Sequence, residues 1–386
     1  MQIGIESLSF YIPHLFIDLK AIAEKKNAPA KVFYRGIGQE KMAVAPPDED
    51  IISMGANAAW QACQTVDTAK IDTLFFATES GVDQSKAAGV YVHRLLQLSP
   101  NCRTVELKQA CYSGTAALQM ATGWIRQHPD SKVLIVMSDI ARYGLSSAGE
   151  PTQGAGSVAM VISAEAKILY LEPFFGLYCE DVMDFWRPNY LDYALVDGKY
   201  SISVYIKALQ SCWNQYKQQS GYSFSDFARF CYHLPFSKMA EKAHHELAKL
   251  ENLALPVAEL DKKIEKGLLY NRIIGNIYTA SLYMGLISML ENSDEELSDK
   301  RLAFFSYGSG CVAEFFSGMV MKNFQSNLPI ARHRDLLKNR IELNYQQYAE
   351  YYNFSLPVDG STLSLDRISR GKFRLKGIRN HMRLYE

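Results

Sequence analysis

Cys111 stands where a cysteine can serve as a nucleophile. A strand-like stretch ends at this residue, and a helix of unusually small residues begins directly after it, within Val105–Ala117. At the start of a helix the backbone N–H groups lack partners, and the helix dipole favours negative charge. Both effects stabilise a thiolate, which is the reactive form of the side chain. The sequence therefore predicts one activated thiol at a buried junction, an arrangement that suits acyl transfer.

The other six cysteines carry no comparable signal. A cysteine in a globular protein is usually a small buried hydrophobe. None of the seven cysteines forms a C-x-x-C pair, which leaves a structural zinc site or a redox dithiol without support. We expect no metal site, and we expect a structural role for Cys63, Cys102, Cys179, Cys212, Cys231 and Cys311.

Two further residues end strand-like stretches and could take part in proton transfer. Glu79 closes the run Leu74–Thr78, and His233 closes an apolar run and is soon followed by Pro235. A strand end beside a loop can face a cleft while it stays partly desolvated. Desolvation raises a carboxyl pKa from about 4.3 towards the range of a general base. Considered alone, each residue also fits an ordinary structural role.

Polar residues in a glycine-rich turn and on helices are candidates for binding. Asn276 follows Gly275 at the start of a second helix of small residues, where its amide can donate to an oxygen or orient a water. The turn Tyr307–Gly310 carries backbone N–H groups that could point into the same cleft. Lys238 and Lys242 lie on a predicted helix and suit a phosphorylated ligand.

The composition restricts the possible classes of function. The chain has 386 residues with 41 basic and 41 acidic side chains. This balance argues against bulk binding to nucleic acid or anionic membranes, although a balanced chain can still carry local basic patches. The first residues lack the features of a signal peptide, and no run approaches the roughly 18 apolar residues of a membrane span. Seven unpaired cysteines fit a reducing compartment, so we expect a cytoplasmic protein.

Short apolar runs alternate with helical periodicities along the chain, which is typical of an α/β fold. An amphipathic helix is expected over Ser201–Gln219 and a polar surface helix over Asp335–Gln347. The alternating run Lys372–Arg379 predicts a half-exposed edge strand, with a phosphate-facing role as the alternative. Core strands are predicted at Ile71–Ala77, Lys132–Ser138, Ser157–Ser163, Phe227–His233, Arg301–Tyr307 and Val312–Met319.

The two halves of the chain share an order of elements. Each has a strand that ends in a candidate residue, a junction into a helix of small residues, and then two more strands. This order predicts an internal duplication, with halves of residues 1–165 and 166–386 and the two junction helices packed back to back. The aromatic-rich, irregular segment 172–198 joins the halves. It either lines a substrate entrance or packs on the core as a surface crossover.

Motifs along nearly the whole chain resemble those of 3-hydroxy-3-methylglutaryl-CoA synthase, most closely the bacterial mevalonate-pathway form. They are ATESGVD around Glu79, QACYSGTA around Cys111, GEPTQGAG around Thr152, DFWRP from Asp184, HLPFSKM from His233, GNIYTASLY around Asn276 and YGSG around Ser309. The resemblance implies a thiolase-like αβαβα five-layer sandwich, usually a homodimer, that condenses acetyl-CoA with acetoacetyl-CoA. It implies no metal or organic cofactor.

The resemblance also implies a catalytic trio. Cys111 would attack acetyl-CoA and hold the acetyl group as a thioester. Glu79 would remove a proton from the acetyl methyl group, and the resulting carbon would attack the ketone of acetoacetyl-CoA. His233 would bind that second substrate and assist proton transfer at the new alkoxide, after which water releases the product. The backbone N–H groups of Cys111 and Ser309 would form the oxyanion hole.

Six residues fall at positions where the family contacts its substrates. The substrate would contact Thr152, Ser201, Asn276 and Ser309, and the CoA phosphates would meet Lys238 and Lys242. No nucleic acid and no membrane is expected as a partner.

Relatives on the same fold give the alternatives. Ketoacyl carrier-protein synthases share a Cys-His-Asn set, but they obtain their carbanion by losing CO2 and need no carboxylate such as Glu79. Thiolases use a second cysteine as acid and base; Cys311 is the candidate, but Glu79 makes it redundant. The β-branching synthase of polyketide assembly uses the same trio on acyl-carrier-protein thioesters, and the compact GEPTQGAG loop and the DFWRP segment favour the mevalonate form instead. A non-catalytic homologue would have lost one of Glu79, Cys111 and His233.

Overall fold

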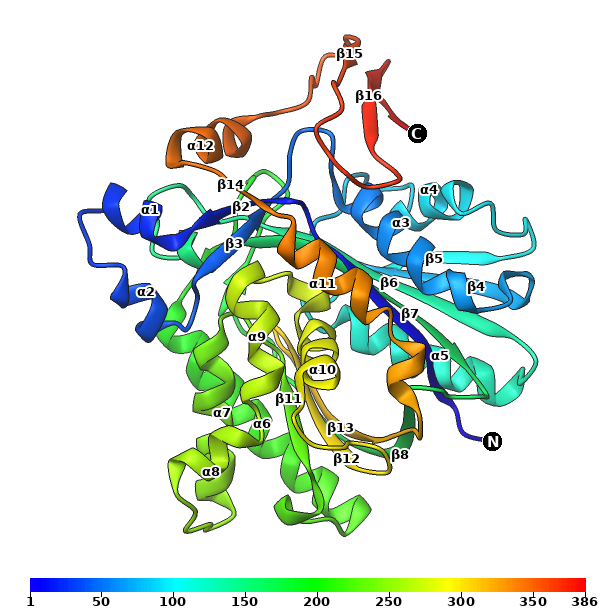
Figure 1. The fold of residues 1–386 in the computed structure, drawn as a ribbon, viewed down its shortest axis with the longest axis vertical. Coiled ribbons are helices and arrows are strands. Elements are labelled where there is room, and N and C mark those ends of the chain that lie inside the picture. The colour runs from blue at the N-terminus through cyan, green and yellow to red at the C-terminus, as the bar shows by residue number, and fades with distance from the viewer.

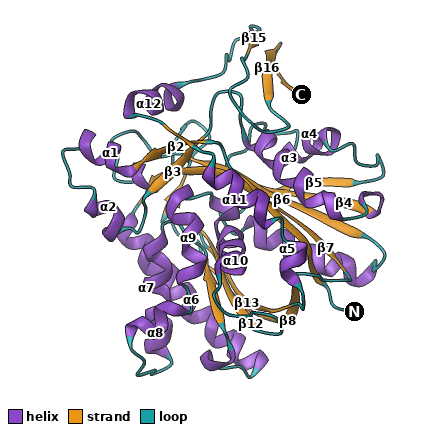
Figure 2. Cartoon of the chain, viewed as in Figure 1, coloured by secondary structure: helices purple, strands orange, loops and turns teal.

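A large sheet of nine strands forms the centre of the molecule (Figure 2). The computed structural model describes residues 1–386. The strands are β1 (Gly4–Tyr11), β4 (Ile71–Ala77), β5 (Arg103–Leu107), β6 (Lys132–Ala141), β7 (Gly154–Ser163), β8 (Leu169–Cys179), β11 (Arg229–Tyr232), β12 (Arg301–Gly308) and β13 (Val312–Val320). Their spatial order is β11-β12-β13-β8-β1-β7-β6-β4-β5.

The sheet repeats one strand pattern in the two halves of the chain. In the first half β1 and β6 flank β7 antiparallel, and β4 pairs parallel with β6. In the second half β8 and β12 flank β13 antiparallel, and β11 pairs parallel with β12. The two patterns join where Gly4 and Ile5 pair with Tyr170 and Leu169. The construction from two similar halves is thus confirmed, and the boundary after residue 165 stays a prediction.

Helices lie outside both halves and between them (Figure 1). They are α3 (Ile51–Ala62), α4 (Ala88–Leu95), α5 (Ser113–Gln127), α6 (Gly198–Ser220), α7 (Ser237–Leu250), α9 (Glu265–Ile274) and α10 (Ser281–Asn292). α3 and α4 cover the outer face of the first half, and α6 and α7 cover that of the second. α5, α9 and α10 share one buried core with the inner faces of both. This arrangement is the predicted five-layer sandwich.

The two junction helices, α5 and α10, approach each other closely. Gly114 begins the contact, because a Cβ at this position would lie 3.0 Å from the carbonyl oxygen of Thr279. On the next residue, Thr115 Oγ1 and Tyr283 Oη form a buried hydrogen bond of 2.8 Å. The two junction helices therefore meet in one buried core, which confirms the predicted back-to-back packing.

All six predicted core strands are present; Ile71–Ala77 has the same ends as β4, and the other five differ at one end or both. β11 covers Arg229–Tyr232 of the predicted Phe227–His233. β6 and β7 are longer than predicted, because β6 continues to Ala141 and β7 already begins at Gly154. The first residues of β7 were not predicted because they include glycines, and glycine weakens the sequence pattern of a strand.

The single helix predicted over Asp335–Gln347 is wrong. α11 (Ile330–Lys338) ends first, β14 (Ile341–Glu342) then pairs with β2 (Leu15–Asp18), and α12 (Tyr345–Asn353) follows. Asn344 caps α12, since its side-chain oxygen accepts the Gln347 N–H at 2.9 Å. Pairing with a strand from the other end of the chain thus divides a segment whose polarity resembled one helix.

The C-terminal strand forms, but it does not lie at an edge. β16 (Leu375–Arg379) is the middle strand of a separate small sheet, between β15 (Leu363–Ser364) and β17 (Met382–Tyr385). This sheet is held on the first half by Asp50, whose carboxylate accepts from Tyr385 Oη at 2.6 Å and from Arg383 at 3.0 Å. The prediction of an edge strand is wrong, since β16 has a partner on each side. The partner strands are only two to four residues long, too short for the sequence pattern to indicate them.

The crossover segment 172–198 is less irregular than predicted. Its first residues continue β8 to Cys179, and β9 (Phe185–Trp186) pairs with β10 (Leu195–Val196) as a small hairpin. The remaining helices and strand are α1 (Leu19–Lys25), α2 (Lys31–Gly36), α8 (Val257–Lys262) and β3 (Lys41–Val44). None of the helices combines the length and the apolar character needed to cross a bilayer.

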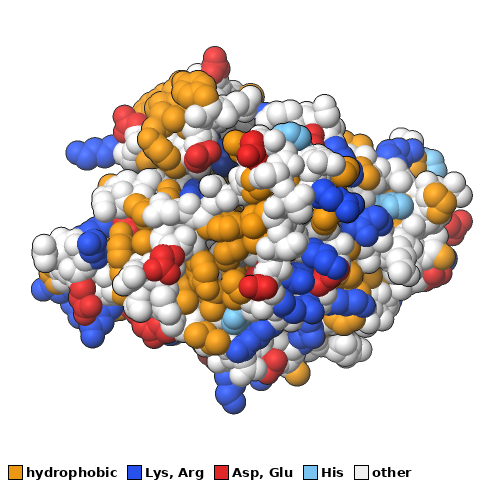
Figure 3. Space-filling view, turned by 90° about the horizontal axis from the view of Figure 1, so that it is seen from above, with side chains coloured by type: hydrophobic (Ala, Val, Ile, Leu, Met, Phe, Trp, Pro, Cys, Tyr) orange, Lys and Arg blue, Asp and Glu red, His pale blue; other side chains and the backbone are white.

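The even balance of charges is not spread evenly over the surface. Figure 3 shows Lys and Arg side chains gathered on one part of the face seen from above. Six exposed cations, on α11 and on the segment between β15 and β16, form no ion pair: Arg332, Arg334, Lys338, Arg367, Arg370 and Lys372. The local basic patch that the composition left open therefore exists.

Candidate active site

Cys111 lies in a short loop between β5 and α5. The loop is held by Ser113, whose hydroxyl donates to the Ala110 carbonyl oxygen at 2.9 Å and accepts from the Gln109 N–H. Ala110 adopts φ 45°, in the left-handed region, so the chain turns sharply just before the cysteine. The thiol is buried, with 9% of its residue surface exposed. A strained turn thus presents one thiol at the edge of the core.

Glu79 meets Cys111 directly. The Sγ–H group donates to Glu79 Oε1, with a separation of 2.7 Å. β4 and β5 are adjacent parallel strands, so their carboxyl ends lie at the same edge of the sheet. Glu79 follows the first of these ends, and the Cys111 loop follows the second. The sheet topology therefore brings together two residues that are 32 positions apart.

Asp139 fixes the loop that carries Glu79 through hydrogen bonds. It lies near the end of β6 and is fully buried. One of its carboxylate oxygens accepts from Thr78 Oγ1, the Glu79 N–H and the Ser80 hydroxyl at 2.8–2.9 Å, and the other accepts from Thr279 of the second half. Asp139 was not among the residues predicted from the sequence. Its signal is an acidic residue inside a long apolar strand beside β4.

Burial and Asp139 make Glu79 a weak acid. Removal from water is the largest cause and the nearby Asp139 charge is the next, and together they raise the pKa of Glu79 to about 8. The predicted desolvation of this carboxyl group is therefore present. At neutral pH the group can both release and accept a proton, which is the property that a general base needs.

The predicted stabilisation of a Cys111 thiolate is wrong for the resting site. Burial first, and then the adjacent Glu79, raise the pKa of the Cys111 thiol well above its usual value. α5 begins only at Ser113, so Cys111 precedes the helix. The helix dipole is worth about 1 kcal/mol near a terminus, which cannot offset desolvation beside a carboxylate. In the resting site Cys111 is therefore a thiol, and it is hydrogen-bonded to the carboxyl group of Glu79.

His233 directly follows β11. Its N–H donates to the Phe305 carbonyl oxygen at 2.8 Å, and its own carbonyl oxygen accepts from Tyr205 Oη at 2.9 Å. The side chain is buried, and burial lowers the pKa of the imidazole to about 3. His233 is therefore neutral at physiological pH. Tyr205 belongs to α6, so its hydroxyl ties His233 to the helix that covers the second half.

Asn276 and Thr152 lie together where two loops meet. The Asn276 N–H donates to the Thr152 carbonyl oxygen at 3.1 Å. Asn276 Oδ1 accepts from the Tyr278 N–H at 2.8 Å and from Ser281 Oγ at 2.9 Å. These bonds fix the amide so that its NH2 group stays available as a donor.

Gly275 makes this contact between loops possible, and alanine there is expected to destabilise the fold by about 3 kcal/mol or more. Its φ is 92°, and a Cβ would lie 1.9 Å from the Gln153 carbonyl oxygen. The measurement is the free energy of unfolding in urea. Gly285→Ala on α10 is the matched control, because its Cβ would meet only an ordinary contact at 3.5 Å. Equal stability of the two variants would contradict the prediction.

Asp184 connects the crossover segment with Ser201 and the turn that carries Ser309. The buried carboxylate accepts from Tyr307 Oη at 2.6 Å, from the Gly310 N–H at 2.9 Å and from Ser201 Oγ at 3.3 Å. Ser309 itself accepts at its carbonyl oxygen from Gln109 Nε2 at 3.3 Å. Ser201 and Ser309 are thus tied to one buried acid, whose role the sequence did not reveal.

Lys238 and Lys242 lie apart from this buried group, on the first turns of α7. The Lys238 ammonium forms an ion pair with Glu241. Lys242 forms no ion pair, and its ammonium lies 5.5 Å from the centre of the Phe236 ring. Both side chains reach the surface of the second half, and their contact with CoA phosphates stays a prediction.

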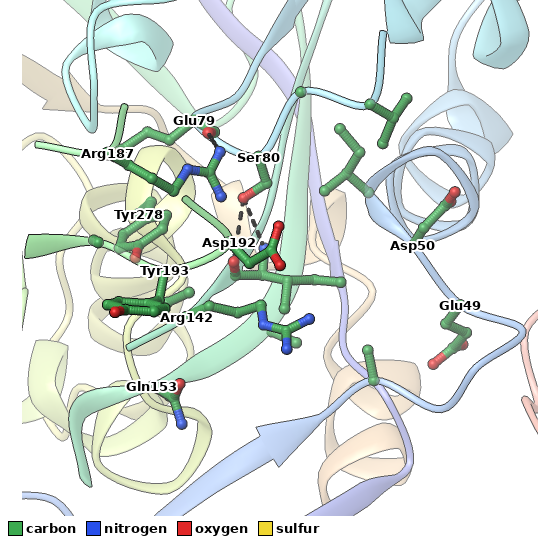
Figure 4. A pocket seen from close by; sticks show the side chains of 18 of the residues that line it. Glu49, Asp50, Glu79, Ser80, Arg142, Gln153, Arg187, Asp192, Tyr193 and Tyr278 are labelled. Atoms are coloured by element: carbon green, nitrogen blue, oxygen red, sulfur yellow. Dashed lines mark hydrogen bonds between the residues drawn. The ribbon is translucent and has the colours of Figure 1, made fainter. Parts of the chain in front are cut away.

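A cleft of about 1580 Å³ is lined by Glu79, but not by Cys111 or His233. Figure 4 shows Arg187 beside Glu79, and its guanidinium donates to the Glu79 carbonyl oxygen at 2.5 Å. Residues 185–194 of the crossover form part of the cleft wall. Phe185 also packs edge-on against Tyr278 and Tyr143, and Tyr278 shares a small buried cluster with Cys111. The crossover therefore lines a cavity beside Glu79 and also packs on buried residues, and its role as a substrate entrance stays a prediction.

The pKa of Glu79 predicts how condensation depends on pH. We expect the Glu79 carboxylate to act as the base, and the pKa of this group is about 8. We expect kcat/KM to rise about tenfold per pH unit below pH 8 and to level off above it. Arg187→Gln removes a charge that lowers the pKa of Glu79, so the rise should move to higher pH. A profile that is flat between pH 6 and 8, or unmoved in this variant, would contradict the assignment.

A buried thiol paired with a carboxyl group, at a junction helix of a duplicated five-layer α/β sandwich, defines a thiolase-like acyl-transferring enzyme. The model of the hydroxymethylglutaryl-CoA synthase N-terminal region matches residues 1–167, and that of its C-terminal region matches residues 169–254 and 245–357. The chain belongs to the hydroxymethylglutaryl-CoA synthase family, which confirms the resemblance found in the motifs.

Individual relatives agree with this assignment. The chain is 41% identical to hydroxymethylglutaryl-CoA synthase of Enterococcus faecalis, over 100% of both chains. It is 32% identical to the polyketide biosynthesis 3-hydroxy-3-methylglutaryl-ACP synthase of Bacillus subtilis (strain 168), over 89% of this chain and 86% of the relative. A crystal structure of an HMG-CoA synthase complexed with CoA matches with a TM-score of 0.95 and 39% identity, over 100% of this chain and 99% of the other.

Proposed function

We propose that the protein condenses acetyl-CoA with acetoacetyl-CoA and water to 3-hydroxy-3-methylglutaryl-CoA and CoA, in the mevalonate pathway. The observation that carries this proposal is the 2.7 Å contact between Cys111 Sγ and Glu79 Oε1. It pairs a nucleophile with a carboxyl group whose pKa, about 8, suits removal of a proton from a methyl group. The 41% identity to the Enterococcus enzyme over the full length supports the same reaction.

The first step transfers the acetyl group to the enzyme. Cys111 Sγ attacks the thioester carbon of acetyl-CoA while its proton passes to Glu79 Oε1, to which it is already hydrogen-bonded. The C–S bond to CoA then breaks, and the same proton goes to the departing CoA sulfur. Glu79 is again a carboxylate. The backbone N–H groups of Cys111 and Ser309 hold the negative oxygen, and a lost donor of this kind typically costs about 3 kcal/mol.

The second step forms the new carbon–carbon bond. Glu79 removes a proton from the methyl group of acetyl-Cys111, and the resulting carbon attacks the ketone carbon of acetoacetyl-CoA. The ketone oxygen becomes an alkoxide, which receives the proton that Glu79 has taken. His233 is neutral, so it can donate a hydrogen bond to this oxygen and relay the proton. Water then cleaves the thioester and restores the Cys111 thiol.

We propose substrate contacts for the remaining candidates. The fixed amide of Asn276 supports a hydrogen bond to the acyl groups, and the nearby Thr152 would share that role. Ser201 and Ser309 would contact the substrate from the other side of the site. Lys238 and Lys242 would bind the CoA phosphates, and the absence of an ion pair at Lys242 supports its availability.

We also propose a homodimer that forms at β5. This strand ends the large sheet, so one of its edges has no partner strand, and its central residue Val105 is 38% exposed. Open edges of this kind commonly pair with another chain. Sedimentation at micromolar concentration is expected to give twice the chain mass of 43.6 kDa.

A cytoplasmic location and the division into halves of residues 1–165 and 166–386 complete the proposal. All seven cysteines are free thiols, which supports a reducing compartment. The repeated strand pattern supports a boundary between β7 and β8.

The carrier of the acyl groups is tested by comparing two sets of substrates. We expect CoA thioesters to be condensed at least as fast as the same acyl groups on an acyl carrier protein, measured by thiol release. The 32% identity to the Bacillus carrier-protein enzyme makes the second set the relevant competitor. Turnover that is far faster with the carrier protein would assign the chain to β-branching in polyketide assembly instead.

A further inference from the structure

A buried polar cluster beside Cys111 has no place in the reaction described above. Glu314 lies on β13 in the second half and is 1% exposed. Its carboxylate accepts from Tyr112 Oη at 2.7 Å and from Gln119 Nε2 at 2.5 Å, and both donors belong to the first half. Burial is the main cause that raises the pKa of Glu314 to about 7. This acid therefore joins the two halves through neutral donors, with no cation beside it.

The titratable groups that face Glu314 are tyrosines and a cysteine. Tyr112 precedes α5, Tyr283 belongs to α10, and Cys212 belongs to α6. Burial is the largest cause that raises the pKa of all three, and the Glu314 charge raises it further. A buried carboxyl group costs free energy of desolvation, which an apolar residue of similar size would avoid. What Glu314 contributes is therefore its pair of hydrogen bonds.

Tyr112 links Glu314 to the loop that carries Cys111. It directly follows Cys111, and the turn that carries Ser309 packs against its backbone. A Cβ on Gly308 would lie 2.6 Å from the Tyr112 nitrogen, so the turn and the loop are in close contact. The backbone N–H groups of Cys111 and Ser309 form no hydrogen bond within the chain. The position of Tyr112 therefore governs how these two free donors lie relative to each other.

We propose that Glu314 is a positioning residue, which holds Tyr112 from the opposite half and so sets the separation of the Cys111 and Ser309 N–H groups that bind the thioester oxygen. This inference rests on the proposed acyl transfer to Cys111. Oxyanion donors act only within a few tenths of an ångström of their target geometry. A brace between the halves supplies that accuracy, because each half carries one of the two donors.

The test separates oxyanion binding from the reactivity of the thiol. Single-turnover acetylation by labelled acetyl-CoA needs both donors, whereas alkylation of Cys111 by iodoacetamide needs neither. We expect Glu314→Leu and Tyr112→Phe to slow acetylation by about tenfold or more. Alkylation and the half-saturating acetyl-CoA concentration should stay within about threefold of wild type. Glu314→Gln keeps an acceptor for Tyr112 and should restore acetylation to near the wild-type rate.

Tyr216→Phe on α6 is the matched control. It removes another buried tyrosine hydroxyl, which donates to Ser317 Oγ at 2.7 Å far from Cys111, and it should lower stability without slowing acetylation. Acetylation at the wild-type rate in both Glu314→Leu and Tyr112→Phe would overturn the inference. An equal loss of acetylation and alkylation would also overturn it, since that pattern indicates general damage. A wild-type protein that alkylates normally but is never acetylated would instead overturn the proposed function, and this inference with it.

Discussion

Cys111→Ala is expected to abolish synthesis of 3-hydroxy-3-methylglutaryl-CoA, with a loss in kcat of about ten-thousandfold or more. In the proposed reaction this side chain holds the acetyl group covalently, so no other group can replace its function. Incubation of the wild type with labelled acetyl-CoA should leave one acetyl group per chain on Cys111, and the variant should carry none. The measurements are intact mass after quenching and the steady-state release of CoA.

The control for this substitution is Cys212→Ala. Cys212 is fully buried on α6, so the chemical change is the same, but its surroundings belong to the outer core of the second half. We expect a modest loss in stability of about 1 kcal/mol and full acetylation. Acetyl label that persists in Cys111→Ala, or that lies on another residue in the wild type, would exclude Cys111 as the nucleophile.

Glu79→Gln is expected to separate acetylation from condensation. Loss of the base should lower the rate of condensation by about a hundredfold to ten-thousandfold. Acetylation should be slower but should still reach one group per chain. It remains possible because solvent can take the thiol proton, and the pKa of the thiol is no longer raised by the Glu79 charge. The two steps are measured by single-turnover labelling and by consumption of acetoacetyl-CoA.

Glu49→Gln is the matched control for the base. Glu49 is another buried carboxyl group whose pKa burial raises to about 8, and it lies at the far end of the cleft from Glu79 in Figure 4. Its replacement should leave condensation within about twofold of wild type. Condensation that survives in Glu79→Gln would show that another group removes the methyl proton, and the assignment of Glu79 would then be wrong.

Much of the fold followed from local patterns. Apolar runs located six of the nine strands of the large sheet, because the strands of a covered sheet are buried on both faces and leave continuous apolar segments. The helix of small residues after Cys111 correctly predicted a close contact, which Thr115 and Tyr283 make. The prediction of one helix over residues 335–347 was wrong because the division of this segment depends on a distant contact. Its polarity is compatible with a helix, and only the pairing of β14 with β2, more than 300 residues away, divides it.

The residues that support the site were harder to predict than those that line it. Asp139 and Asp184 both fix loops of the site, but each acts through contacts with segments distant in the sequence. No spacing rule marks such a residue, since its partners are set by the packing of separate strands. Arg187 was visible only as part of the DFWRP motif, and its contact with Glu79 depends on the path of the crossover.

The sequence by itself determined the family, the order of the elements and the identity of Cys111, Glu79 and His233 as candidates. These properties reside in motifs, which are local. The state of the thiol was decided only by the tertiary structure. A helix start predicted a thiolate, whereas burial beside Glu79 keeps the proton on Cys111. A pKa depends on the distance of the group from charges and from water. The parallel pairing of β4 with β5 sets these distances for Cys111 and Glu79.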